Sequence, residues 1–307
     1  MAKPTEVRGL SAATPMPEAA RAFLVARLAD VQRHLGKLGT RLKPDDVHDA
    51  RVATRRLRAA LTMLGDRRRV READRVVKDL QDALGAVRDL QVQLDGFGKL
   101  SDQAGPLERT ALRHLRQALA GELLPRAEAL KEAMPRWERR GVEALGRLEA
   151  LEPKGRLGGH RFRLTLIAGL ERLEARVIGA QEDPSPTPMH QLRKMVKRFR
   201  YLLELLEPAM PGEIEEIQGH LIPLQESLGN LHDTDVRLAV VDAHGDVRSQ
   251  GTDSLLQRLR GDRDRQAQEV LRALETWEEE AVALRAQVLL SASPLKREGG
   301  PRAADRE

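Results

Sequence analysis

The sequence contains no cysteine, and this absence excludes three kinds of chemistry. Without thiols the chain cannot form disulfide bonds, use a thiol nucleophile or bind a metal through thiolates. The sequence also lacks an apolar run close to the roughly 20 residues that a membrane-spanning helix requires. Its first segment, MAKPTEVRGLSAATPMPEAA, contains no apolar signal core, so we expect a cytoplasmic protein.

Aromatic residues are scarce, with two Trp, one Tyr and four Phe among 307 residues. Proteins that bind single-stranded nucleic acids stack the bases on aromatic side chains, and this chain offers few such platforms. Hydrophobic residues nevertheless make up 41% of the chain, too high a fraction for a disordered protein. A chain of this length can bury a sizeable core, in one large domain or in two of ordinary size.

The net charge is small, because 52 Lys and Arg are balanced by 47 Asp and Glu to give +5. Only ten of the basic residues are Lys and the other 42 are Arg, whose planar guanidinium suits carboxylate and phosphate oxygens. Many of these arginines alternate with acidic residues, as in Glu171-Arg172-Leu173-Glu174, which is typical of a solvated helix face. The distribution of the basic residues therefore carries more information than their sum.

Helical periodicity dominates the sequence and predicts an all-α fold. In the first helix, Leu24, Leu28, Val31 and Leu35 follow one another at steps of four, three and four residues. The pattern predicts eight helices, which begin and end at about residues 17–35, 45–64, 70–94, 106–123 (or as far as 131), 160–178, 188–206, 212–241 and 252–290. Gly and Pro between 152 and 159 predict a break near the middle of the chain. We expect flexible tails over residues 1–15 and 293–307.

The second half of the sequence repeats the first. A shift of 142 residues superimposes apolar and basic positions of the first two helices on those of the fifth and sixth: Leu24 on Leu166, Leu28 on Leu170, His48 on His190, Arg51 on Arg193, Arg56 on Arg198 and Arg58 on Arg200. A shift of 144 superimposes a later segment: Leu84 on Leu228, Gly85 on Gly229 and Asp89 on Asp233. Because these matches occur in the same order, they indicate a duplication. We predict one domain over residues 16–292, formed by two duplicated four-helix bundles (16–150 and 155–292) that a pseudo-two-fold axis relates.

One predicted helix in each half carries a basic face opposite an apolar face, because a helix turns by about 100° per residue. In the first, the basic face is His48, Arg51, Arg55 and Arg58, and the apolar face is Ala50, Thr54, Leu57, Leu61 and Leu64. In the second, the basic face is His190, Arg193, Lys197 and Arg200, and the apolar face is Leu192, Val196, Phe199, Leu203 and Leu206.

These basic faces differ from ordinary solvated faces, since no acidic residue lies between His190 and Arg200. Like charges at four-residue spacing destabilise a helix, and positive charge in its first turn opposes the helix dipole. The same repulsion recurs at matching positions in both halves. The pattern therefore favours a bound anion that neutralises it, with a merely cationic surface as the alternative.

The motifs that carry these faces are His-x-x-Arg-x-x-x-Arg-Arg-x-Arg (48–58) and His-x-x-Arg-Lys-x-x-Lys-Arg-x-Arg-Tyr (190–201), each followed by Leu-Gly-x-x-x-Asp. They resemble the conserved histidine α-helical domain, CHAD, and the resemblance extends from about residue 17 to residue 290. It implies a module that binds inorganic polyphosphate in a basic central cavity or groove between the bundles. The ligand-binding residues that it implies are His48, Arg51, Arg55, Arg56, Arg58, His190, Arg193, Lys194, Lys197, Arg198 and Arg200. Many relatives carry a fused triphosphate-hydrolysing domain, whereas this sequence contains no acidic β-rich segment of that kind.

Polyphosphate is a chemically suitable ligand for such faces, because it offers charged oxygens and no bases to stack. Successive turns of a basic helix place donors about 5–6 Å apart, within reach of alternate phosphates. By analogy with DNA, the affinity should fall steeply with salt. We therefore expect a protein that is not an enzyme and that uses neither a cofactor nor a metal ion.

Further arginines are weaker candidates for contact with the ligand: Arg21, Arg163, Arg109, Arg113, Arg116, Arg260 and Arg263. Arg21 and Arg163 match across the repeat, although an arginine at a helix end also extends towards water in many proteins. Asp89 and Asp233 follow the Leu-Gly steps, and we expect them to form structural ion pairs with arginines rather than to act in catalysis.

Three other functions are open to this sequence. His48-Asp49 and His232-Asp233 match the His-Asp dipeptide of metal-dependent phosphohydrolases, but the repeat preserves neither dipeptide, and the arginines around His48 would repel a metal ion. Cationic helices also bind the backbone of nucleic acids. In the third, the basic surface docks onto an acidic partner or a polyphosphate granule. No membrane partner is expected.

Overall fold

The computed structural model describes residues 3–64, 67–148, 152–244 and 249–277, and these residues form an all-α fold, as predicted. In chain order the α-helices are α1 (Met16–Leu35), α2 (Pro44–Leu61), α3 (Arg67–Asp102), α4 (Pro106–Gly146), α5 (His160–Glu182), α6 (Pro186–Glu204), α7 (Pro211–Ala243) and α8 (Gln250–Glu275). A short 3-10 helix, η1 (Thr62–Leu64), follows α2. Outside the helices, Pro15 and Arg156 form an isolated β-bridge.

Proline marks the start of several helices. Pro44, Pro106, Pro186 and Pro211 are the first residues of α2, α4, α6 and α7. Proline suits this position because its fixed φ is helical and the amide hydrogen that it lacks would have no partner within the helix. The predicted starts of these four helices are therefore confirmed to within two residues.

Two helices are much longer than the sequence predicts, and α5 ends four residues beyond its predicted end. α3 continues past the predicted end at 94 to Asp102, and α4 continues to Gly146 through Pro125 and Pro135. Both prolines are exposed, whereas Leu130 and Trp137 of the same helix are buried in the core. Apolar packing along one face thus maintains α4 where a proline removes a backbone hydrogen bond. The last part of the predicted eighth helix, 278–290, lies outside the described residues.

The segment before α1 forms contacts that its sequence did not predict. The backbone N–H of Thr5 donates to the buried Asp30 carboxylate at 3.1 Å, and its hydroxyl donates to the same group at 2.6 Å. The backbone N–H of Leu157 donates to the carbonyl oxygen of Thr14 at 2.9 Å. Single polar contacts of this kind leave no periodic pattern in a sequence. For this reason the prediction of a flexible tail over residues 1–15 did not include them. The other predicted tail, 293–307, lies outside the described residues.

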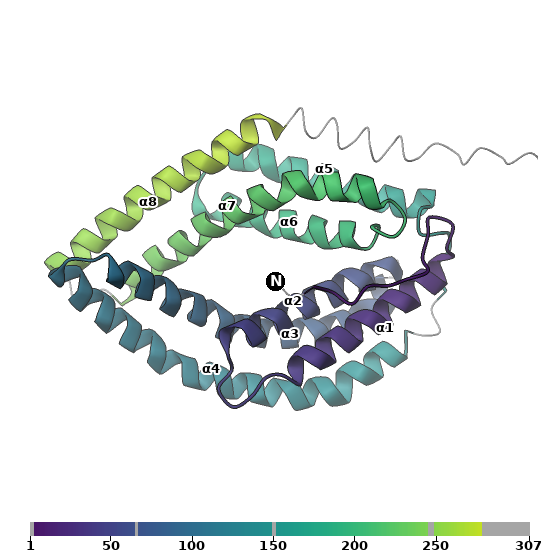
Figure 1. The fold of residues 1–307 in the computed structure, drawn as a ribbon, viewed down its shortest axis with the longest axis horizontal. Helices are drawn as coiled ribbons and strands as arrows, with labels where there is room; N and C mark the ends of the chain where they lie inside the picture. Colours follow the sequence, from purple (N-terminus) through teal and green to yellow (C-terminus); the bar gives the residue numbers. More distant parts are fainter. Residues whose placement is uncertain (1–2, 65–66, 149–151, 245–248, 278–307) are drawn as a thin grey trace, which may run out of the picture.

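The two halves of the chain face each other (Figure 1). Helices α1, α2 and α3 lie in the lower half of the view and α5, α6 and α7 in the upper half, with α4 and α8 along the outer edges. Across the halves, α2 contacts α6, α3 contacts α7 and α4 contacts α8. Three pairs of helices at equivalent places in the repeat therefore meet each other, and the pseudo-two-fold axis stays a prediction.

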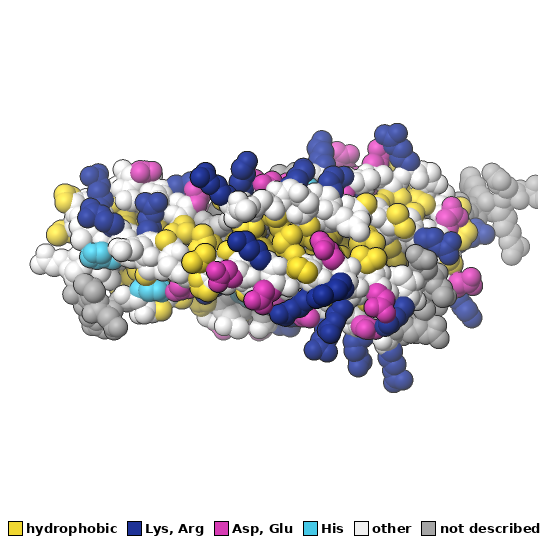
Figure 2. All heavy atoms as spheres, turned by 90° about the horizontal axis from the view of Figure 1, so that it is seen from below, with side chains coloured by type: hydrophobic (Ala, Val, Ile, Leu, Met, Phe, Trp, Pro, Cys, Tyr) yellow, Lys and Arg dark blue, Asp and Glu magenta, His cyan; other side chains and the backbone are white. Residues whose placement is uncertain are grey.

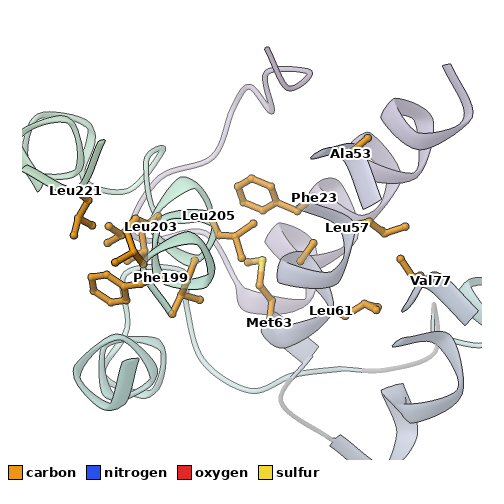
Figure 3. Close-up of a cluster of buried hydrophobic side chains, with 14 of the residues drawn as sticks. Phe23, Ala53, Leu57, Leu61, Met63, Val77, Phe199, Leu203, Leu205 and Leu221 are labelled. Carbon is orange, nitrogen blue, oxygen red and sulfur yellow. The ribbon is translucent and has the colours of Figure 1, made fainter. Parts of the chain in front are cut away.

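Apolar side chains of both halves pack into one main core (Figure 3). Phe23, Leu57 and Met63 come from the first half, and Phe199 and Leu205 from the second. A smaller cluster joins α3, α4, α7 and α8 around Phe97 and Leu112. On the outer face in Figure 2, basic and acidic side chains are interspersed. The two halves thus share a core. Since positive and negative charges are mixed on this outer face, the place to look for an excess of basic residues is where the two halves meet.

Candidate anion-binding site

The basic faces of α2 and α6 arise from the burial of their apolar faces. Every predicted apolar-face residue of both helices is buried: Ala50, Thr54, Leu57, Leu61, Leu64, Leu192, Val196, Phe199, Leu203 and Leu206. Since a helix that buries one side turns the other away from the core, the basic faces are partly exposed, except that Arg200 is buried. The predicted burial of the two apolar faces is confirmed.

Four cations from the two helices lie close enough to repel one another. They are Arg51 and Arg55 of α2 and Arg193 and Lys197 of α6, and we call them the central cluster. Burial lowers the pKa of Lys197 to about 6, and the charges of the other three contribute. Burial and the charge of Arg55 lower the pKa of Arg51 to about 10. The structure therefore brings the two predicted faces together.

The central cluster contains donors that the folded chain does not use. The Nε atoms of Arg51 and Arg193 are buried and have no hydrogen-bond partner among the described residues. An unsatisfied buried donor costs free energy, and a phosphate oxygen is a suitable acceptor for it. The cluster therefore has both the charge and the free donors that an anion needs.

Histidines adjoin the cluster on both sides. Nδ1 of His190 lies 3.1 Å from Nδ1 of His232 on α7, so one ring donates a hydrogen bond to the other. Burial and the charge of Arg193 lower the pKa of His232 to about 3. Burial, followed by the charge of Arg88, lowers the pKa of His48. Without a ligand these rings are held in the neutral form, and a bound anion would favour their protonation.

Two carboxylates also lie near the cluster. Oδ1 of Asp89 lies 3.6 Å from Nη2 of Arg51, which confirms the predicted ion pair for that residue. Burial raises the pKa of Asp233, and the charges of Arg193, Arg237 and Lys197 oppose this effect. The two acids offset part of the positive charge of the four cations.

Other predicted ligand residues have partners elsewhere in the fold. Nε of Arg56 donates to Glu204 of α6 at 2.7 Å, and its guanidinium lies 5.9 Å from the centre of the Tyr201 ring. Nε of Arg58 donates to Asp74 at 2.7 Å. The structure gives Arg56 and Arg58 each a carboxylate partner, and their contact with the ligand stays a prediction.

The remaining predicted ligand residues of α6 differ in how far they are buried. Nη1 of Arg200 donates to the neutral Gln225 at 2.8 Å, and its Nε is buried without a hydrogen-bond partner among the described residues. Lys194 and Arg198 are exposed.

The weaker candidates do not form one group. The exposed ones are Arg21, Arg109, Arg113, Arg116 and Arg260. Arg21 lines an open groove between α1 and residues 6–8. Arg263 donates to Asp235 at 3.2 Å and to the carbonyl oxygen of Pro184 at 2.7 Å. Arg163 retains a buried Nε without a hydrogen-bond partner among the described residues. Of this set, Arg163 alone has such a buried, unused donor.

Sequence reasoning missed two residues of the site, both on α7. In the sequence, His232 stands out only as part of a His-Asp dipeptide, and no pattern singles out Arg237. The 144-residue shift places Arg88 and Gln93 at their counterparts, so the repeat could not identify either residue. Their contacts with α6 and α3 depend on how the helices pack, and the helix sequences alone do not contain that information.

The histidines and carboxylates near the cluster are not arranged as a metal site. In the described ranges, no group of three or more His, Cys, Asp or Glu side chains is positioned to hold a metal ion. The same ranges contain no helix that is both long enough and apolar enough to span a membrane.

Comparisons with known proteins agree with the fold. The CHAD domain family model matches residues 22–242. The crystal structure of the CHAD domain from the plant Ricinus communis superimposes with a TM-score of 0.66 at 21% identity, over 94% of this chain and 96% of that one. PptA from Streptomyces chartreusis superimposes with a TM-score of 0.60 at 18% identity, over 86% of this chain and 100% of that one. Among curated proteins, none matches the sequence. The extent of the family match shows that the chain belongs to the CHAD domain family.

Proposed function

We propose that this protein binds inorganic polyphosphate, without transforming it, through the central cluster of Arg51, Arg55, Arg193 and Lys197. The observation that carries the proposal is the convergence of these four side chains, from two separate helices, with burial enough to lower the pKa of Lys197 to about 6. Burying several cations close together destabilises the free protein. Such an arrangement is typical of a site where a bound anion offsets the destabilisation.

The unused donors support the same ligand. Each charge-assisted hydrogen bond to a phosphate oxygen contributes about 1.5–3 kcal/mol. Arg51 and Arg193 each hold a buried Nε without a hydrogen-bond partner in the described part of the chain. A polymer of phosphates presents several acceptors in a row, so it can use donors from α2 and α6 at once. Membership of the CHAD family adds support, because the resemblance in the sequence implies this ligand.

A nucleic-acid backbone is the second candidate, since the same cations would attract it. Against it, the chain has seven aromatic residues in total, and these offer little surface for stacked bases. A competition experiment distinguishes the two ligands. Labelled duplex DNA or long-chain polyphosphate is bound to the protein at low salt and then titrated with the other polymer, with both concentrations expressed per phosphate.

We expect polyphosphate to displace DNA at a far lower phosphate concentration than DNA displaces polyphosphate. Equal competition would contradict the proposal, and stronger binding of DNA would favour the second candidate. The affinity for polyphosphate should also fall steeply as salt rises, because binding releases condensed counterions.

Metal-dependent hydrolysis has less support from the geometry. His232 of the His-Asp dipeptide lies against His190, and cations rather than carboxylates dominate its surroundings. Addition of Mn²⁺ or Zn²⁺ to the protein with polyphosphate should release no phosphate.

In cells, the proposed binding would place the protein on polyphosphate granules, which fluorescence microscopy of a tagged copy can test.

A further inference from the structure

The segment before α1 joins the two halves of the molecule at one end (Figure 1). The backbone N–H of Leu157, shortly before α5, donates to the carbonyl oxygen of Thr14 at 2.9 Å. The N–H of Gly158 donates to the carbonyl oxygen of Ala12, also at 2.9 Å. A Cβ at Gly158 would lie 2.6 Å from the Cβ of Ala12, so only glycine allows the two backbones to approach this closely. Because α1 belongs to the first half and α5 to the second, these contacts tie the starts of both helices together.

The other end of the segment is anchored on α1 by a buried ion pair. Nη1 of Arg27 donates to the carbonyl oxygen of Thr5 at 3.0 Å and to the carboxylate of Asp30 at 2.7 Å. The side chains of Arg27 and Asp30 are 6% and 3% exposed. Burial raises the pKa of Asp30, but the hydrogen bonds from Thr5 and the charge of Arg27 outweigh burial and lower it. Asp30 is therefore held as a carboxylate, and it accepts hydrogen bonds from both the backbone and the hydroxyl of Thr5.

Between the two anchors the segment follows the surface of the first half. Val7 and Leu10 pack against the main core, whereas Glu6, Arg8 and Gly9 are exposed. The CHAD family model matches residues 22–242, so the family match assigns no role to this segment.

We propose that residues 3–15 are a clasp that holds α1 and α5 together and thereby keeps the basic faces of α2 and α6 in position for the ligand. α1 packs against α2, and α5 packs against α6, so a shift of α1 relative to α5 is passed on to the two basic faces. The inference rests on the proposed function for one of its two readouts, and it concerns residues that do not belong to the basic faces.

The test opens the clasp at either end. Gly158→Ala acts at α5, because the new methyl group would lie 2.6 Å from the Cβ and 2.9 Å from the Cα of Ala12, and the backbone must then move apart. Its matched control is Gly39→Ala, which also lies outside the helices and whose Cβ would meet nothing within 4 Å. Thr5→Val acts at α1, since it removes the hydroxyl that donates to Asp30, and Thr5→Ser keeps that hydroxyl.

Two measurements are made on each variant. Because the sequence has no cysteine, Leu124→Cys on α4 and Ile178→Cys on α5 introduce the only two sites for spin labels, one in each half. These two side chains are 64% and 54% exposed, so the labels should leave the core intact. Pulsed electron paramagnetic resonance then gives the distribution of distances between the halves. Calorimetric titration of the unlabelled protein gives the affinity for long-chain polyphosphate.

We expect Gly158→Ala to broaden the distance distribution and to weaken polyphosphate binding about fivefold, as when the arrangement that binds is populated about a fifth of the time. Added polyphosphate should narrow the distribution again, because the ligand favours that arrangement. Thr5→Val, which removes one hydroxyl, should weaken binding about twofold. Thr5→Ser and Gly39→Ala should match the wild type in both measurements.

Wild-type affinity in a folded Gly158→Ala variant would overturn the proposal, and so would weaker binding with an unchanged distance distribution. A thermal melt shows whether each variant folds. If Gly158→Ala does not fold, equal affinities of Thr5→Val and Thr5→Ser would overturn the proposal in its place. Failure of the wild type to bind polyphosphate would instead refute the proposed function, and the distance distributions would still show whether the clasp holds the halves together.

Discussion

The basic faces of α2 and α6 have nearly the same sequence but different electrostatic surroundings. On α2, three arginines lie beside carboxylates: Arg51 beside Asp89, Arg56 beside Glu204 and Arg58 beside Asp74. On α6, Arg200 donates to a neutral amide, Arg193 keeps an unused Nε, and Lys197 has a pKa of about 6. The fold therefore places carboxylate partners against three arginines of α2, whereas in the described part of the chain Arg193, Lys197 and Arg200 of α6 have no carboxylate within ion-pair distance.

The difference shows that matching positions in a duplicated sequence need not do the same work. Arg56 of α2 joins the two halves through Glu204, whereas its counterpart Arg198 is exposed. At this position the first motif thus contributes a contact between the halves. Arg51 and Arg193, which also match, both keep a buried Nε without a hydrogen-bond partner among the described residues, so they are the better candidates for ligand contact.

The largest effect on stability is expected where the α2 face joins the α6 helix. Glu204→Gln removes the charge opposite Arg56 in a pair whose side chains are 10% and 15% exposed. Because the charge of a nearly buried ion pair is lost on one side, we expect the free energy of unfolding to fall by about 3 kcal/mol. The matched variant Asp74→Asn breaks the more exposed Arg58 pair and should cost less than about 1 kcal/mol. Urea denaturation measures both, and equal losses would mean that the Arg56–Glu204 pair does not hold the halves together.

The next effect concerns the pH dependence that Lys197 confers on α6. In the free protein this lysine has a pKa of about 6, and a bound polyanion would raise the pKa, so binding takes up a proton above pH 6. Affinity for polyphosphate should therefore fall as pH rises, by at most about a hundredfold from pH 6 to pH 8. Titration calorimetry in buffers of different ionisation enthalpy measures the proton uptake directly.

Lys197→Met is the control for this pH dependence. The variant should bind more weakly at pH 6 and lose most of the pH dependence. The free energy of unfolding should rise in this variant, although its affinity for polyphosphate falls. The folded state holds the Lys197 proton less tightly than the unfolded state, so the charge destabilises the fold below pH 6, and this cost declines as pH rises. At pH 7 we expect the methionine variant to be more stable by about 1–3 kcal/mol. A less stable variant with unchanged pH dependence would contradict this role.

The smallest effect on affinity should come from removing the carboxylate of α3 that lies beside the α2 face. Asp89→Asn removes the acid that lies 3.6 Å from Arg51. Since Asp89 is mostly exposed, the gain in affinity for polyphosphate should be at most about threefold at low salt and should vanish at high salt. Weaker binding by this variant would mean that Asp89 holds Arg51 in place for the ligand.

The sequence predicted the elements of this fold well where a helix buries one continuous apolar face. The apolar faces of α2 and α6 illustrate this, because their periodicity identified both the buried and the basic sides. Helix length was less predictable in α4, which passes through Pro125 and Pro135. Apolar packing on the opposite side of the helix compensates for the backbone hydrogen bonds that these prolines remove. The presence of proline in a sequence does not show whether such packing exists.

The site was predictable at positions that the repeat preserves and unpredictable at positions set by contacts between helices. Arg51 and Arg193 match across the repeat, and both belong to the central cluster. Arg56 matches Arg198 equally well, but its carboxylate partner lies 148 residues away in the other half. His232 and Arg237 have no equivalent side chain in the first half, so only the packing of α7 against α6 and α3 shows their place.

The most direct test of polyphosphate binding by the α2 and α6 faces is calorimetric titration of the double variant Arg51→Glu, Arg193→Glu beside the wild type at low salt. Both side chains lie outside the apolar core, so circular dichroism should show a helical, cooperatively melting protein. We expect the wild type to bind long-chain polyphosphate and the folded double variant to show no measurable binding. Wild-type affinity in the folded double variant would contradict the assignment of the site.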